Sequence, residues 1–170
     1  EFLKKIRDRH VKHRNAMVSL EYTLNDFMNI NAVNLSQLDA LIDSIEKGLV
    51  FRTQFTPLVL TREMLLQFSN IDYIRETFDL YTDINKINLD LILLYERYKD
   101  IWEFFFDKKI SFENLKVNHK AVQVQAIDLR KFVESLSVKI EIHSAKTNVL
   151  FNEEESFLDW ALANFSNSKY

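Results

Sequence analysis

The sequence is poor in the residues that make turns and cross-links: its 170 residues include one glycine, one proline and no cysteine. Average usage would supply about a dozen glycines and about eight prolines at this length. Sandwiches, barrels and meanders need many tight turns, which these residues provide, so such folds are excluded. A single glycine also excludes glycine-rich phosphate loops and dinucleotide fingerprints. The missing cysteine excludes disulfides, thiolate metal sites and cysteine nucleophiles.

Charge is distributed unevenly along the chain. Residues 1–14 hold six Lys and Arg against two Asp and Glu, a net charge of +4, whereas the rest holds 16 against 23, a net charge of −7. The acidic body has no continuous basic stripe, which argues against nucleic-acid binding. The basic leader (residues 1–14) predicts a local contact with an anionic membrane surface.

The chain begins at Glu1 rather than Met, which we interpret as a fragment or a processed product. No stretch approaches 18 consecutive apolar residues, the length typical of a membrane span. The Lys and Arg of residues 1–14 are what the cytoplasmic flank of a removed transmembrane helix would contain. The alternative is that they form the solvated first turn of an ordinary soluble helix. The abundance of Asn, Ile, Lys and Phe suits a bacterium with an AT-rich genome. We therefore expect a bacterial protein on the cytoplasmic side of the membrane.

Apolar residues alternate spacings of three and four from Leu3 to Ile45, and the phase is held through Asn31 and Asn34. This pattern predicts one helix over about residues 2–47, ended by Lys47–Gly48. The alternative is a break near residues 29–34. The two asparagines either fix the register of the helix against its neighbours or mark a kink or a hydrated gap.

The remaining chain predicts one crossover and three further helices. Residues 49–60 hold the only proline and are expected to be extended, and residues 61–68 form a short helical piece. A second long helix runs from Ser69 to about Lys109, and Ser111 caps a third whose apolar stripe continues to His143. A final short helix opens at Asn152, with Glu155 completing a capping box. The predicted fold is all-α: one domain over residues 1–170, an elongated antiparallel bundle of three long helices and one short C-terminal helix.

All four histidines fall in the apolar stripes of these helices. If successive helices alternate direction, His10 and His119 lie at the same height, roughly 12 Å above one end, and His13 lies one turn higher. These three imidazoles form a candidate metal site. The alternatives are hydrogen bonding within a polar layer, or pH sensing through protonation near the ordinary pKa of about 6.5. No cofactor is expected.

Three consecutive phenylalanines follow Trp102 near the end of the second long helix. Three helical residues in a row cover an arc of about 200°, so one apolar stripe cannot bury them all. The final segment, with Phe157 and Trp160, could cover the surplus; otherwise it faces a protein partner, a second copy or a membrane. Alternating helix directions place this end beside the basic leader. The predicted contact face then comprises Lys4, Lys5, Arg7, Arg9, Trp102, Phe104, Phe105, Phe106, Lys108 and Lys109.

Two resemblances bear on function. The stretch RHVKHRNAMVSLEYTLND is similar to the start of the soluble region in certain uncharacterised bacterial proteins, where a short N-terminal membrane anchor precedes a helical domain. This resemblance implies a tethered bundle and no catalytic residues. The spacing Arg7-Asp8-x4-His13 resembles the motif of HEPN-domain ribonucleases, which would make Arg7 and His13 catalytic. In that family the motif sits late in the bundle, whereas here it opens the first helix.

We therefore expect a non-catalytic, membrane-tethered or membrane-proximal helical module that serves interaction or sensing, with an unknown ligand. A soluble helical scaffold or adaptor and a HEPN-like ribonuclease are the alternatives.

Overall fold

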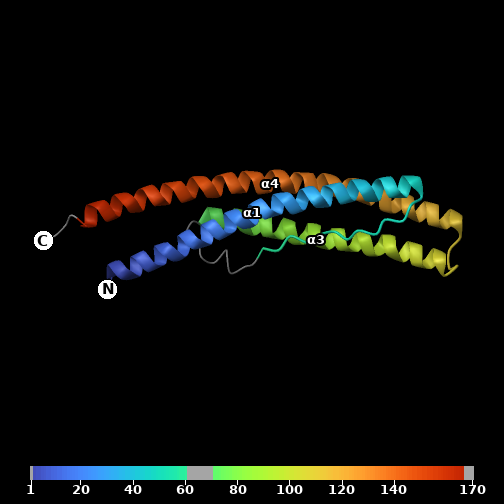
Figure 1. Ribbon diagram of the computed structural model, residues 1–170, viewed down its shortest axis with the longest axis horizontal. Helices are drawn as coiled ribbons and strands as arrows, with labels where there is room; N and C mark the ends of the chain where they lie inside the picture. Colours follow the sequence, from blue (N-terminus) through green and yellow to red (C-terminus); the bar gives the residue numbers. More distant parts are fainter. Residues whose placement is uncertain (1, 61–70, 167–170) are drawn as a thin grey trace.

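Three long helices account for most of the structure. A computed structural model of the chain describes residues 2–60 and 71–166, and within them the side chains of residues 2, 3, 6, 9 and 154–166 lie outside the description. Helix α1 spans Phe2–Lys47, α3 spans Ile71–Phe106 and α4 spans Phe112–Ser166 (Figure 1). The described residues contain no strand, so the predicted all-α class is confirmed. The short helical piece predicted over residues 61–68 lies outside the described residues.

Helix α1 passes through the asparagine-rich stretch without a break, as the phase of its apolar stripe predicts. The stripe is buried from its second quarter onward, at Met17, Leu20, Leu24, Phe27, Leu38 and Leu41. Asn31 and Asn34 lie in the same stripe and are fully buried. The alternative break at residues 29–34 is therefore wrong. Asparagine costs only about 0.7 kcal/mol in a helix, less than burial of one leucine returns.

The helix ends follow local backbone chemistry. After α1, Gly48 adopts a φ of 66°, and the amides of Gly48 and Leu49 donate to the carbonyls of Ile45 (3.2 Å) and Ser44 (2.8 Å). This is a Schellman cap, and it confirms the predicted end at Lys47–Gly48. At the start of α4, the Ser111 hydroxyl accepts from the Asn114 amide at 3.2 Å, which confirms Ser111 as the N-cap.

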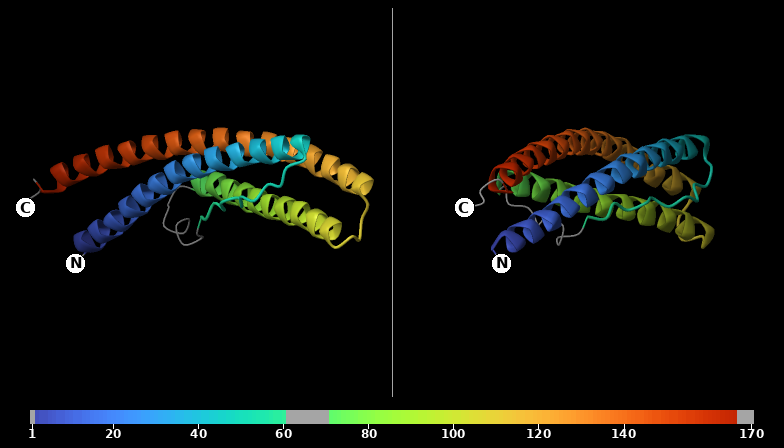
Figure 2. Two further views of the ribbon diagram at one scale, coloured as in Figure 1. Left: turned by 45° about the vertical axis from the view of Figure 1, so that its right-hand side comes forward. Right: turned by 60° about the vertical axis from the view of Figure 1, so that its left-hand side comes forward.

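The predicted alternation of helix directions is wrong. Contacts between α1 and α4 run from Asp39–Arg130 to Glu46–Gln123, so the numbering rises in α1 as it falls in α4. Contacts between α3 and α4 run the same way, from Glu76–Lys146 to Asp83–Lys139. Helices α1 and α3 are therefore parallel to each other, and each is antiparallel to α4 (Figure 2). Twelve extended residues span about 40 Å, so the crossover returns along the bundle before α3 begins.

The crossover, called the strap (residues 49–60), runs along the bundle between α1 and α3 (Figure 2) and contacts both helices. The side-chain amide of Asn34 in α1 pairs with both backbone groups of Thr56, at 2.8 and 2.9 Å. The amide of Asn88 in α3 pairs in the same way with Leu58, at 2.6 and 2.9 Å. Buried Phe51, Leu58 and Leu60 fix the strap to the core.

Helix α4 continues through Asn152, where a separate short helix was expected to begin. The predicted count of three long helices and one short C-terminal helix is therefore not found in the described residues. Asn152 and Glu155 suit a helix start, but nothing between them and Ser111 stops a helix, because that stretch has neither glycine nor proline. A capping pattern permits a new helix without ending the previous one.

Candidate functional site

The residues predicted to share one contact face lie at opposite ends of the bundle. Lys4, Lys5 and Arg7 are exposed near the start of α1, and the side chain of Arg9 lies outside the described residues. The aromatic end of α3 instead meets the C-terminus of α1, where Trp102 shares a pocket with residues 45–48. Both chain termini lie at the end opposite the α3–α4 turn (Figure 1). This separation arises because α1 and α3 are parallel, whereas the prediction assumed that successive helices alternate in direction.

The candidate metal site is not assembled either. Arg14, one residue beyond His13, lies over the ring of Phe151 in α4, at 5.6 Å. His119 is 32 residues away from Phe151 along the same helix, which is about 48 Å at ~1.5 Å per residue. His10 and His13 therefore cannot share a metal with His119. No group of three or more His, Asp or Glu suited to a metal occurs among the described residues.

Arg7 and His13, the pair of the ribonuclease-like motif, occupy different faces of α1. A separation of six residues turns about 120° around a helix and advances about 9 Å. Arg7 is exposed, whereas His13 is partly buried. Within one chain the two side chains do not converge on a common substrate position.

A pocket of about 670 Å³ opens at the α3–α4 turn, and we call it the distal pocket. Its walls are the C-terminal end of α1 (residues 45–48), Trp102 of α3, and the first three turns of α4 between Phe112 and Gln123. The Schellman cap at Gly48 and the Ser111 cap hold the helix ends that form it. The distal pocket thus joins all three helices at the end far from the basic leader.

The core side of the distal pocket is aromatic. The His119 ring stacks on Tyr98 with centroids 5.4 Å apart. The Trp102 ring is tilted against the same histidine, with centroids 4.9 Å apart. Trp102 also stacks on Phe106 at 5.5 Å. His119 is 6% exposed, and burial lowers its pKa below 6.5, so the imidazole is neutral at neutral pH.

Two ring nitrogens at this pocket have no hydrogen-bond partner among the described residues. They are Nε2 of His119 and Nε1 of Trp102, and both are shielded from solvent. An indole N–H is a donor only, so Trp102 needs an acceptor to replace the water it loses on folding. Leaving such a group unpaired costs about 1–3 kcal/mol. The sequence pattern identified both residues as buried or contact residues, but could not show that they meet.

The pocket is bordered by positive charge. The Lys116 ammonium lies 4.5 Å above the Phe112 ring, and neither Lys116 nor Lys120 forms an ion pair within the described part of the chain. Glu46, the carboxylate of the lining, accepts a hydrogen bond from Gln123 at 2.9 Å. Lys47 is paired with Asp43 at 2.8 Å. The two free cations of the lining are therefore on α4.

The surplus aromatic surface stays open. Phe104 is 46% and Phe106 is 65% exposed, while Phe105 is partly buried. The expected cover, the C-terminal segment, belongs to the part of α4 that runs to the opposite end of the molecule (Figure 1). The side chains of Phe157 and Trp160 lie outside the described residues.

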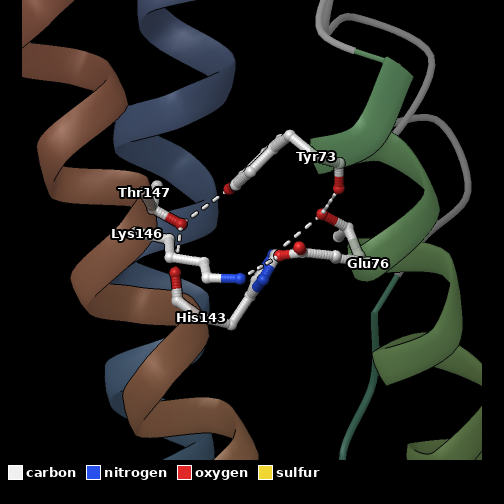
Figure 3. A network of polar contacts seen from close by, with 6 residues as sticks. Tyr73, Glu76, His143, Lys146 and Thr147 are labelled. Carbon is white, nitrogen blue, oxygen red and sulfur yellow. Dashed lines mark hydrogen bonds and ion pairs between the residues drawn. The ribbon is translucent and has the colours of Figure 1, made fainter.

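A second polar cluster, missed by the sequence analysis apart from His143, lies between α3 and α4 (Figure 3). Each threonine hydroxyl has one proton: Thr147 donates it to the His143 carbonyl (2.8 Å) and Thr77 donates it to the Tyr73 carbonyl (2.7 Å). Tyr73 must then donate to Thr147 (2.6 Å), and Nε2–H of His143 to Thr77 (2.8 Å). The His143 ring thus donates through Nε2.

Burial dominates the titration of this cluster. It raises the pKa of Tyr73 to about 12 and lowers the pKa of His143 from 6.5 to about 4. The two rings stack with centroids 4.8 Å apart, and the ion pair of Glu76 with Lys146, at 2.7 Å, borders them on the solvent side (Figure 3). Tyr73, Thr77, His143 and Thr147 are joined by hydrogen bonds across the two helices, which supports a structural role for the cluster. A period-3.6 alignment of Tyr73 and Thr77 was the signal that could have found it.

Comparison with protein-family models, with curated proteins and with solved structures found no match. None of the described helices has an apolar stretch long enough to cross a bilayer.

Proposed function

We propose that this chain is a non-catalytic helical module for interaction or sensing, which approaches an anionic membrane surface through the basic end of α1. The observation that carries the proposal is the exposure of Lys4, Lys5, Arg7 and Lys12 at one tip of an elongated bundle. The aromatic residues of α3, at the other tip, take no part in this contact.

The expected strength follows from the charge count. Each Lys or Arg near an anionic leaflet contributes about 1 kcal/mol, so four exposed cations supply about 4 kcal/mol. That corresponds to a dissociation constant of about 1 mM. Such an attraction orients a chain that is tethered to the cytoplasmic leaflet, but it holds a free chain only weakly and at low salt.

The non-catalytic part of the proposal is supported by the separation of Arg7 from His13 around α1 and by the pairing within the His143 cluster. The Thr77 hydroxyl beside His143 is buried and donates its proton to the Tyr73 carbonyl, so neither arrangement offers an activated nucleophile.

Vesicle flotation at low salt tests the membrane contact. We expect the chain to float with phosphatidylserine-rich vesicles and not with phosphatidylcholine vesicles, and the variant K4E/K5E/R7E to lose flotation. The matched control is K108E/K109E, which changes exposed lysines at the opposite tip and should behave as wild type. Equal flotation of the two variants, or equal binding to both lipids, would contradict the proposal and favour a helical scaffold without a membrane role.

A further inference from the structure

We propose that the distal pocket binds a small organic anion with a flat apolar body, such as an aromatic carboxylate or sulfonate. This site is at the opposite tip from the membrane contact, and the inference does not depend on the proposed membrane function. It is argued from the shape of the pocket, its unpaired donors and its charge.

The walls favour a flat apolar body. Trp102 from α3 and Phe112 from α4 contribute aromatic side chains to the lining, and Leu115 adds an aliphatic one. The volume of about 670 Å³ falls in the range of small-molecule sites, and polar side chains line the rest of the pocket. Aromatic rings of a ligand stack favourably on such walls.

The unpaired nitrogens call for an acceptor on the ligand. The Trp102 N–H can only donate, and the neutral His119 donates through Nε2 when its proton is there. An acceptor placed against both would remove two buried unpaired groups at once. Both nitrogens belong to residues that line the pocket and both are shielded from solvent, so an acceptor on the ligand meets them only when neighbouring side chains shift.

The charge of the lining decides the sign of the ligand. Lys116 and Lys120 form no ion pair within the described residues, and together they outnumber the Glu46 carboxylate, which accepts a hydrogen bond from the neutral Gln123 amide. A cation would be repelled, and a neutral apolar molecule would leave the two lysines and the two ring nitrogens as they are. A carboxylate or sulfonate can accept hydrogen bonds from the two lysines and from the two ring nitrogens. Such charge-assisted hydrogen bonds are about twice as strong as neutral ones.

The probe for this site is 1-anilinonaphthalene-8-sulfonate, an aromatic anion, compared with N-phenyl-1-naphthylamine, which lacks the sulfonate. Titrations without lipid, in a W160F background that leaves Trp102 as the only tryptophan, follow probe fluorescence and the indole N–H resonance. We expect saturable binding of the sulfonate, a shift of the Trp102 resonance, and at least tenfold weaker binding of the neutral probe.

Variants separate the pocket from other apolar surface. K116Q/K120Q should weaken binding of the sulfonate by about tenfold, and W102F by about fivefold, the loss of one hydrogen bond. The control K131Q/K139Q, on the same helix but in ion pairs elsewhere, should stay within about twofold of wild type. An unmoved Trp102 resonance, equal affinity for the neutral probe, or equal effects of the two lysine pairs would overturn the inference. None of these results depends on vesicle flotation.

Discussion

Protonation of His143 is expected to destabilise the fold as the pH falls from about 6.5 to about 4. The imidazole is 5% exposed, stacks on Tyr73 and donates its Nε2 proton to Thr77. Burial lowers its pKa to about 4, an effect that the nearby Glu76 opposes and Lys146 reinforces. In the unfolded chain the same group titrates near 6.5.

The sign and the size of the effect follow from linkage. Above pH 6.5 the group is neutral in both states and has no effect on stability. Below that, the unfolded state binds a proton that the native state refuses until about pH 4, so the free energy of unfolding falls with pH. With these two pKa values the loss is about 2 kcal/mol at pH 5, and it levels off at about 3 kcal/mol below pH 4.

Urea unfolding at pH 7 and pH 5, followed by circular dichroism, measures this loss. The variant H143Q keeps a neutral amide that can donate to Thr77 and cannot titrate, so its free energy of unfolding should fall by about 2 kcal/mol less than that of wild type over this interval. The control H10Q, at a partly exposed position near the start of α1, should show the wild-type pH dependence. If H143Q loses as much stability as wild type between the two pH values, the assignment to His143 is refuted.

Two further predictions concern backbone contacts and use the same assay. Lys108 holds a φ of 58° after α3, a value that favours glycine, so K108G should stabilise the fold by about 1 kcal/mol. Gly48 has a φ of 66° and open space where a Cβ would stand, so G48A should destabilise the fold by a similar amount through backbone strain alone. Any other pair of signs would contradict the cap assignment. N88A removes both hydrogen bonds to the buried Leu58 backbone and should lower the free energy of unfolding by about 2 kcal/mol. N34A removes the two bonds to Thr56, and it should cost less because Thr56 is exposed to water. The exposed N85A on the same helix as Asn88 should be neutral within about 0.5 kcal/mol, and equal effects of N85A and N88A would argue against the strap bonds.

Periodicity predicted what depends on local burial. The phase held from Met17 to Leu41 gave one helix, and the structure buries both ends of that stripe on α4. The caps at Gly48 and Ser111 were equally readable, because each depends on a few neighbouring backbone groups. The membrane contact and the expected partner stay predictions, since no observation of the fold tests them.

The assembly of the candidate sites could not be predicted, because it depends on the direction of α3. Residues 49–60 were recognised as extended, yet their apolar pattern does not say whether they cross the end of the bundle or return along it. That single choice decides whether Trp102 meets the basic leader or the C-terminus of α1. The sequence predicted that His119 is buried, but its contact with Trp102 depends on the direction of α3 and was not predicted.

Two asparagines, buried Asn34 and partly buried Asn88, explain why the strap returns along the bundle. An extended segment that enters a helical core brings backbone N–H and C=O groups that no helix can satisfy, since helices use their own. A primary amide offers one acceptor and two donors, and it matches the backbone of one extended residue. Asn34 and Asn88 do this for Thr56 and Leu58 from two parallel helices. Asn34 therefore marks neither a kink nor a hydrated gap: its polarity in the apolar stripe is the complement of the strap, which makes the parallel course of α1 and α3 possible.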